Sequence, residues 1–375
     1  MNRQQFAAWA FIAPALAVIA LLSGPGRAIA DRPAVGAIRW DAWYGHESGP
    51  GRDVVRALST PRFLGRLPFF AELDPVGRPQ LPGYTSQVMG AEIQAAVAAG
   101  LDFWAFVLYR PESEMSRGLA AFLAHPQSSR LRFCVISEVQ RWHPTTIPAD
   151  TGRVADLMAR PNYHRTPSGR PILFLLAQNP APAERTWRHS GGLAGLVEAI
   201  RNAAKARNLP NPYVVFMAPR ATDAAALADR ARGDAVSAYA VHPASGRGSY
   251  AALANHAERH WNAMRSTKCQ VIPLAMVGWD RRPRAERPVS WETNRGQMAD
   301  PTRYFEKPTA DQLASHISKA LRWVRAHPES SDADSVLIYS WNEHDEGGAI
   351  CPNLGDWDAM VRALRPVLVL PAEKP

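Results

Sequence analysis

Two glutamates near the end of the chain, Glu343 and Glu346, are the residues best suited to proton chemistry. They follow the apolar, β-prone run 336–341 and the amide of Asn342, a pattern typical of a buried parallel strand that delivers polar groups to a catalytic mouth. Two carboxyl groups held close together repel each other's charge, so one can stay protonated as an acid while the other stays ionised as a base. This division suits glycoside chemistry. The competing interpretation is a strand end followed by a solvated acidic loop.

Eight short apolar runs, rich in β-branched and aromatic residues, recur along the chain. They span residues 35–40, 103–109, 131–138, 172–177, 213–218, 235–241, 270–277 and 335–341. Their near-continuous apolarity is expected of parallel strands that are covered on both faces. Helical patterns lie between most of them, and the clearest begin at Ser86, before Gly100 closes the segment, and after Thr309, where Gln312 completes a capping-box pattern. Strands that alternate with helices predict an α/β fold in which residues 31–375 form a single (β/α)8 TIM barrel.

Two long connections, 41–85 and 278–308, follow the first and the seventh predicted strands and are rich in Pro, Gly, Trp and charged residues. Long loops in a compact domain usually carry function. In a barrel they would emerge on the face that holds active sites.

Polar and aromatic side chains follow the ends of the predicted strands, and a barrel would gather them at one rim. Aromatic faces pack against the C–H surfaces of sugar rings, and carboxylates and amides hydrogen-bond sugar hydroxyls, so this inventory fits carbohydrate better than an apolar ligand. The candidate substrate-binding residues are Asp41, Trp43, Tyr44, Tyr109, Glu138, Tyr239, His242, Trp279, Asp280, Trp341 and Asn342. The three tryptophans could instead fill the barrel mouth, and Glu138 could be a structural partner of Arg110 or Arg220.

No metal site or cofactor is expected. The histidines and carboxylates around the Glu pair match no zinc or calcium spacing, and no Gly-rich nucleotide-binding fingerprint follows the first strand. The chain has three cysteines, Cys134, Cys269 and Cys351, which are too few for a disulfide framework. Two of them could pair, and at least one must stay free or pair outside the chain.

The chain carries a formal net charge of +9. We find no zinc-finger spacing, aromatic RNA-binding motif or dense Lys/Arg tract, so nucleic acid is not the expected partner. A glycan, possibly an anionic one, fits better. The nearest approach to a basic patch is the segment 280–287, for which a solvated loop is an equal alternative.

Several motifs, taken in order along residues 35–365, resemble the WbsX-like and glycoside hydrolase family 99-like proteins. They are GAIRWDAWY at 36–44, Glu92-Ile93, Ala99-Gly100-Leu101-Asp102, Asn162-Tyr163, Gly169-Arg170-Pro171, Val277-Gly278-Trp279-Asp280, and Trp341-Asn342-Glu343 followed by Glu346-Gly347. The resemblance implies a (β/α)8 barrel with a carbohydrate-processing site.

The resemblance also implies a role for each glutamate. In the endo-α-mannosidase branch of the family, the last strand supplies two glutamates three residues apart. Carried onto this chain, Glu343 would draw the proton from the sugar's 2-hydroxyl to form a strained anhydro intermediate. Glu346 would protonate the leaving oxygen and then activate water, with retention at the anomeric carbon. The chain departs from the family at His344, where Trp is usual, and at Cys351, where Glu is usual.

These observations together predict a glycoside hydrolase that acts on a polysaccharide or oligosaccharide. A WbsX-type glycosyltransferase and a non-catalytic glycan-binding barrel are the alternatives. A transferase would need a sugar donor, and the sequence offers no convincing nucleotide-phosphate site.

The first thirty residues have the form of a secretory signal. Arg3 precedes an apolar stretch at 7–22, and Ala28-Ile29-Ala30 is a small-x-small cleavage site. A membrane anchor is the competing interpretation, but the stretch is short for a bilayer span and Pro14 interrupts it. We therefore expect export to the periplasm or the medium, without a stable anchor.

Cleavage after Ala30 gives the first testable prediction. Mass spectrometry of the exported protein should find a mature chain that begins at Asp31. A membrane-bound form that retains residues 1–30 would contradict both the cleavage and the export.

Overall fold

The computed structural model describes residues 32–44, 49–81, 85–243, 246–292 and 300–369. The predicted signal peptide and its cleavage site after Ala30 lie outside the described residues. The chain divides into two compact units, Met1–Pro33 and Ala34–Pro375, and the fold described here is that of the second unit.

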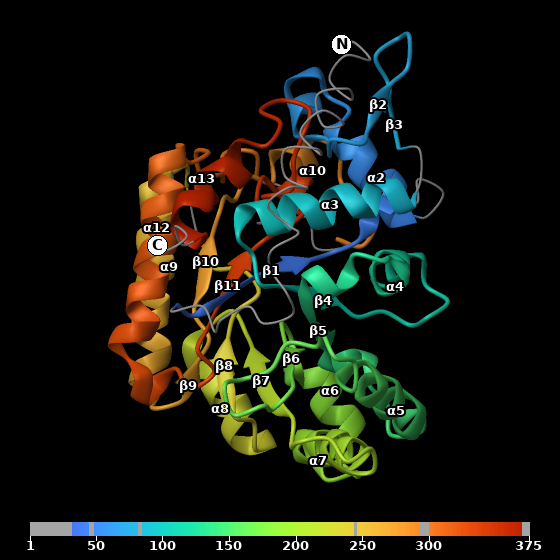
Figure 1. Ribbon diagram of the computed structural model, residues 1–375, viewed down its shortest axis with the longest axis vertical. Helices are drawn as coiled ribbons and strands as arrows, with labels where there is room; N and C mark the ends of the chain where they lie inside the picture. Colours follow the sequence, from blue (N-terminus) through green and yellow to red (C-terminus); the bar gives the residue numbers. More distant parts are fainter. Residues whose placement is uncertain (1–31, 45–48, 82–84, 244–245, 293–299, 370–375) are drawn as a thin grey trace, which may run out of the picture. The chain divides into compact units, whose positions relative to one another are not determined.

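Nine parallel strands form one sheet in the order β10-β11-β1-β4-β5-β6-β7-β8-β9 (Figure 1). The strands are β1 (Ala34–Arg39), β4 (Phe103–Val107), β5 (Arg132–Glu138), β6 (Ile172–Leu176), β7 (Tyr213–Met217), β8 (Ala235–Ser237), β9 (Gln270–Val271), β10 (Leu274–Met276) and β11 (Ser335–Tyr339). The first and last of the predicted strands are neighbours, with Ala37 of β1 opposite Ile338 of β11. This confirms the α/β class with a parallel sheet.

Burial on both faces explains why these runs are strands. All residues of β4, β7 and β11 are buried, which leaves no polar face to alternate with an apolar one. Several strands end earlier than their apolar patterns predict. Tyr109, Tyr239 and Trp341 belong to the predicted apolar runs but follow the last residues of β4, β8 and β11.

The seventh predicted strand, 270–277, is two strands in the structure. Pro273 lies between β9 and β10 and has no N–H to donate to a ladder. The residues at the interruption still hydrogen-bond to both neighbouring strands. Ile272 N donates to Val236 O at 3.0 Å, and Pro273 O accepts from Leu337 N at 3.0 Å. The segment therefore hydrogen-bonds to β8 on one side and to β11 on the other.

The helices confirm the strongest sequence signals. Helix α3 (Ser86–Ala99) begins after Thr85 and ends at Gly100, whose φ of 85° is the left-handed geometry that glycine adopts readily. Helix α12 (Ala310–Ala326) has the predicted capping box between Thr309 and Gln312. The other helices are α2 (Gly49–Leu58), α4 (Arg117–Ala124), α5 (Ile147–Met158), α6 (Pro180–Trp187), α7 (Gly192–Lys205), α8 (Ala221–Ala231), α9 (Tyr250–Ser266), α10 (Arg282–Glu286) and α13 (Ala359–Leu368).

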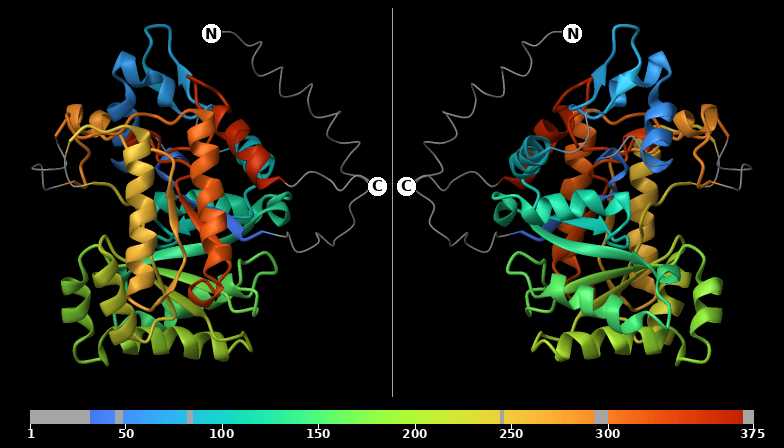
Figure 2. Two further views of the ribbon diagram at one scale, coloured as in Figure 1. Left: turned by 90° about the vertical axis from the view of Figure 1, so that its left-hand side faces the viewer. Right: turned by 90° about the vertical axis from the view of Figure 1, so that its right-hand side faces the viewer.

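A local turn at Asn353 precedes helix α13, which begins at Ala359. The Asn353 side chain accepts hydrogen bonds from the backbone N–H groups of Gly355 and Asp356, and this local turn competes with helix. Helices α9 and α12 lie side by side against β10 (Figure 2). No helix in the described ranges is long and apolar enough to cross a membrane.

The two long connections contain structure of their own. The first holds α2 and a small hairpin, β2 (Glu72–Leu73) and β3 (Pro79–Gln80), and the second holds α10. Helices α2 and α10 pack together, and the Ser290 N–H donates to Asp53 Oδ2 of α2 at 2.5 Å. This contact holds α10 in place beside the ends of the strands.

Close packing at Gly36 gives a stability prediction. A Cβ atom there would overlap the ring of Phe103, which is held by stacking on His164 at a centroid distance of 3.8 Å. Gly36→Ala should therefore lower the free energy of unfolding by about 1–3 kcal/mol, measured by urea denaturation. Gly49→Ala is the matched control, because nothing lies within 4 Å of its Cβ position. Equal stability of the two variants would contradict the packing argument.

Candidate active site

A cavity of about 800 Å³ opens at the carboxyl ends of the parallel strands. Its wall takes residues at or just after the ends of β1, β4, β5, β6, β7, β8, β10 and β11, together with residues of the two long connections. In parallel α/β folds this edge of the sheet is where active sites form.

Seven of the thirteen predicted site residues line this cavity: Tyr109, Glu138, Tyr239, His242, Trp279, Glu343 and Glu346. The other six are buried and are not among the lining residues: Asp41, Trp43, Tyr44, Asp280, Trp341 and Asn342. The structure brings the first set together and places the second set in supporting networks behind the wall.

Arg39 at the end of β1 organises the largest of these networks. Its side chain is 0% exposed. Its Nε donates to Asp41 Oδ1 at 2.8 Å, and its Nη2 donates to Glu92 Oε2 at 2.9 Å and to the Tyr44 hydroxyl. Trp341 Nε1 donates to Glu92 Oε1 at 3.0 Å. Burial raises the pKa of Asp41 to about 6, against the opposing attraction of Arg39. Asp41, Tyr44 and Trp341 were predicted to bind substrate. They are instead buried residues that support the cavity wall.

Asn342 joins the ends of β1 and β11 immediately before the Glu pair. Its Oδ1 accepts from the Trp40 N–H at 2.9 Å, and its Nδ2 donates to Asp41 Oδ1 at 3.3 Å. Its backbone oxygen accepts from Trp43 Nε1 at 2.8 Å. Both the oxygen and the nitrogen of the side-chain amide are thus hydrogen-bonded, and these bonds fix the position of the next residue, Glu343.

Asp280 anchors the second long connection. It forms ion pairs with Arg66 and with Arg282, the latter through Arg282 Nε at 2.8 Å from Asp280 Oδ1. Burial raises its pKa, but these two guanidinium groups outweigh burial and lower it below the ordinary value. Asp280 is therefore an ionised structural residue.

Two arginines that the sequence interpretation did not assign to the site are central to it. Arg281 and Arg284 are 5% and 6% exposed, so the segment 280–287 is not a solvated loop at these positions. Pro283 in the first turn of α10 is the local signal that could have indicated a helix here.

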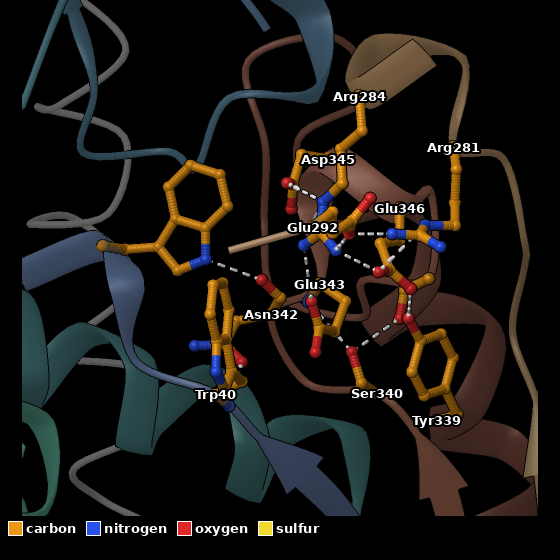
Figure 3. A network of polar contacts seen from close by, with 12 residues as sticks. Trp40, Arg281, Arg284, Glu292, Tyr339, Ser340, Asn342, Glu343, Asp345 and Glu346 are labelled. Carbon is orange, nitrogen blue, oxygen red and sulfur yellow. Dashed lines mark hydrogen bonds and ion pairs between the residues drawn. The ribbon is translucent and has the colours of Figure 1, made fainter. Parts of the chain in front are cut away.

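Arg284 contacts four carboxyl groups (Figure 3). Its Nε lies 2.6 Å from Asp345 Oδ2, and its Nη1 lies 3.0 Å from Glu292 Oε1. Nη1 also pairs with Glu346 Oε1, and Nη2 lies 3.5 Å from Glu343 Oε2. One guanidinium on α10 thus spans both candidate catalytic residues.

Glu346 is the more strongly paired of the two. Its Oε1 contacts Arg284 and lies 3.2 Å from Arg281 Nε, and its Oε2 accepts from the Tyr339 hydroxyl. Burial pushes the pKa of Glu346 upward, but both guanidinium charges and the tyrosine hydroxyl outweigh burial, so the pKa falls below its ordinary value.

Glu343 has the opposite shift. Its Oε1 accepts from the Tyr239 hydroxyl at 2.9 Å, and its backbone N–H donates to Ser340 Oγ at 2.9 Å. Burial, followed by the charge of Glu346, raises its pKa well above the ordinary value. The two carboxyl groups are therefore shifted in opposite directions, as expected of a close pair with different surroundings.

Aromatic rings surround the pair. Trp40 and Trp291, which the sequence analysis did not select, lie 5.4 Å apart between ring centroids at the cavity wall. Trp40 directly follows β1, and this position is the signal that could have indicated it. His242 stacks on Trp279 at 4.1 Å, and burial lowers the pKa of His242 to about 4. The imidazole is therefore neutral near pH 7.

A second cavity of about 610 Å³ adjoins the first. Tyr109 and Arg141 line both cavities, and the Arg141 guanidinium lies 3.9 Å from the centroid of the Tyr109 ring. Arg141 Nη2 also lies 2.8 Å from Glu138 Oε1, so Glu138 pairs with Arg141 and not with Arg110 or Arg220, the partners considered from the sequence. The Tyr109–Arg141 stack forms the shared wall.

The three cysteines are free thiols. Burial raises the pKa of Cys351 well above its ordinary value, with a further contribution from the charge of Glu92, so its thiol stays protonated. Across the described residues, no group of three or more His, Cys, Asp and Glu side chains is arranged to hold a metal ion.

Comparisons with known proteins support the fold. No family model matches the sequence, and no curated protein matches it. Two structures of the family 99 endo-alpha-mannosidase from Bacteroides thetaiotaomicron are similar at 15% identity. One, with bis-tris propane, has a TM-score of 0.54 and covers 89% of this chain and 94% of its own. The other has a TM-score of 0.53, with 89% and 95% covered. The chain therefore shares the TIM-barrel-like fold of these glycosidases, which confirms the resemblance at the level of the fold.

His344 gives a pH-dependence prediction. Burial lowers its pKa from 6.5 to about 3, while its ring lies edge-on to Trp43 at 5.1 Å. Between pH 6.5 and pH 3 the His344 imidazole binds a proton in the unfolded chain but not in the folded chain. The free energy of unfolding therefore falls as the pH falls from 6.5 towards 3. In urea denaturation from pH 7 to pH 4, His344→Gln should reduce the slope of unfolding free energy against pH by up to about 1.4 kcal/mol per unit. Identical slopes in the two proteins would contradict this assignment.

Proposed function

We propose that this chain is a retaining glycoside hydrolase that acts on a polysaccharide or oligosaccharide through Glu343 and Glu346. One observation carries the proposal: two buried carboxyl groups, with pKa values shifted in opposite directions, lie in the wall of a cavity at the carboxyl ends of parallel strands. Glycosidases need one protonated and one ionised carboxyl group at the same bond. We further propose that the sheet is a (β/α)8 barrel whose seventh strand is interrupted at Pro273.

The walls of the cavity suit a sugar. Trp40, Trp279 and Trp291 offer aromatic faces for the C–H surfaces of a pyranose, and Gln178 and Tyr239 offer hydrogen-bonding groups. The adjoining cavity supplies room for further sugar units along a chain. Both features favour a glycan over a small apolar ligand.

The charged residues in the cavity wall indicate which class of glycan, neutral or anionic, fits the site. Three arginines face four glutamates in its wall: Arg141, Arg281, Arg284, Glu138, Glu292, Glu343 and Glu346. This wall has no excess of positive charge, so a neutral sugar fits beside the Glu pair better than an anionic one. Any acidic group of the substrate would have to bind elsewhere.

The structural neighbours give a starting point for the substrate search, because they are endo-alpha-mannosidases. We therefore propose α-linked mannosides as the first members of a neutral glycan panel. Export after cleavage at Ala30 remains part of the proposal, since a hydrolase of external glycans must reach them.

The Glu pair gives the main test of this function. On a glycan that the wild type cleaves, Glu343→Gln and Glu346→Gln should each lower the rate by about 10²- to 10⁴-fold, because each removes a reacting carboxyl group at nearly constant volume. Exposed Glu329, which pairs with Arg265, provides the matched control, and Glu329→Gln should keep the wild-type rate. Product analysis and circular dichroism are the measurements.

Wild-type rates in both Gln variants would overturn the assignment. Tight glycan binding without turnover by the wild type would instead favour the glycan-binding barrel. Transfer of sugar from a nucleotide donor would favour the glycosyltransferase.

A further inference from the structure

The second cavity, which adjoins the first, has a different balance of charge in its wall. Its volume of about 610 Å³ lies within the range of about 300–1,000 Å³ that is usual for ligand sites. Arg110, Arg141 and Arg153 line it, and Glu112 and Asp150 are the carboxyl groups in the same wall. Arginines therefore outnumber carboxyl groups here, whereas carboxyl groups outnumber arginines in the wall of the first cavity.

Arg153, on helix α5, is anchored through one nitrogen of its guanidinium group. Its Nη1 donates to the backbone oxygen of Tyr109 at 2.5 Å, which ties the side chain to the segment after β4. Its Nε and Nη2 make no hydrogen bond or ion pair within the part of the chain that the structure describes. Neither atom is among the buried polar atoms that lack a partner, so both reach the solvent of the cavity that Arg153 lines.

The two open nitrogens of Arg153 are those that suit a carboxylate. Nε and Nη2 lie on the same edge of a guanidinium group, and their parallel N–H bonds match the two oxygens of a carboxylate or of a sulfate. Arg282 uses this edge in the same chain, with Nε 2.8 Å from Asp280 Oδ1 and Nη2 2.6 Å from Asp280 Oδ2. Arg153 presents the same edge to the cavity with no carboxylate of the described residues on it.

The carboxyl groups of the cavity do not compensate the charge of Arg153 fully. Asp150 and Glu112 are near enough to favour its charged form, but burial outweighs both and lowers the pKa of Arg153 below the ordinary value. Within the described ranges neither forms an ion pair with it, and Asp150 Oδ2 accepts from Thr146 Oγ1 at 2.6 Å. An anionic group of a ligand would supply the missing partner.

Arg110 is a second open cation in this wall. Its side chain is exposed and forms no ion pair with any described residue. Arg141 differs, because it lies 2.8 Å from Glu138 and stacks on the Tyr109 ring. The cavity thus combines one anchored guanidinium edge with one further positive charge, a combination that suits a carboxylate or a sulfate.

We propose that the second cavity binds an acidic group of the glycan, either a uronic acid carboxylate or a sulfate ester, through Arg153 and Arg110. The inference rests on the proposed glycoside hydrolase function and adds a substrate class to it. The substrate would carry a neutral sugar at the Glu pair and an acidic sugar farther along the chain. Tyr109 and Arg141 line both cavities, so one glycan that passes this stack reaches both.

Arginine NMR tests the binding site without any turnover. The probes are methyl α-mannopyranoside, the corresponding methyl mannosiduronate, and the methyl mannoside with a sulfate ester on its primary hydroxyl. In protein with ¹⁵N-labelled arginine, the Nε–H signal of Arg153, assigned through Arg153→Lys, should shift with an anionic probe and not with the neutral one. A response to the uronate alone, or to the sulfate ester alone, identifies which acidic group the cavity takes.

Arg160 is the internal control in this titration, because it is exposed and does not line the cavity. No shift of Arg153 with either anionic probe would overturn the inference. Equal shifts with the neutral probe would overturn it in favour of a neutral sugar site, and equal shifts of Arg160 would reduce the effect to general counterion binding.

Substrate preference tests the same residues during turnover. The substrates are an acidic glycan that the wild type cleaves and its carboxyl-reduced or desulfated form, and the measured quantity is the ratio of their kcat/KM values. Arg153→Gln should lower the preference for the acidic form by about 10- to 100-fold, because charge-assisted hydrogen bonds are lost. Arg153→Lys should lower it less, since the charge remains but the paired edge is lost. A purely structural role of Arg153 would change both rates and leave their ratio unmoved.

Arg110→Gln guards against a folding defect in the Arg153 variants, because Arg110 is exposed, and it should also lower the preference for the acidic form. Arg160→Gln is the matched control and should keep the wild-type ratio. Cleavage of glycans with no preference for acidic forms, unchanged in these variants, would overturn the inference and leave the hydrolase function standing. Conversely, anion-dependent shifts of Arg153 without cleavage of any glycan would support the acidic site and refute the proposed function.

Discussion

The need to pair buried charge determines how this site is built. Arg39 and Arg284 are both removed from solvent, and an unpaired guanidinium in such a place would be strongly destabilising. The charge of Arg39 is paired with Asp41 and Glu92, and this pairing holds the end of β1. Arg284 is satisfied by carboxyl groups that follow β11. Each arginine thus fixes one side of the cavity wall.

The parallel sheet makes these pairings possible. Because β1 and β11 are neighbours, the residues after their carboxyl ends lie close together although about 300 positions separate them in sequence. Asn342 bonds across this junction, and Glu343 follows directly. Helix α10 reaches the same place because α2 packs on it, so the first connection supports the arginine that contacts the Glu pair.

Sequence patterns predicted the sheet, the best-capped helices and the cavity-lining Glu343, Glu346 and Trp279, because these depend on local apolar runs and their ends. They did not separate lining residues from supporting ones. Asp41 follows β1 as a rim residue would, yet its carboxyl group turns inward to Arg39. Arg284 lies in a segment as charged as a solvated loop, yet the packing of α10 against α2 and against the turn that carries Glu346 buries it. Such burial depends on tertiary contacts that spacing does not encode.

A shared fold leaves the chemistry of the pair open, because function depends on the site and not on the scaffold. The groups around Glu343 and Glu346 determine how each carboxyl group is held. Here two guanidinium groups contact Glu346, and a tyrosine hydroxyl is the closest donor to the Glu343 carboxyl group. Arg284, four residues after Asp280, thus contacts a glutamate some sixty positions later without being part of the strand that precedes it.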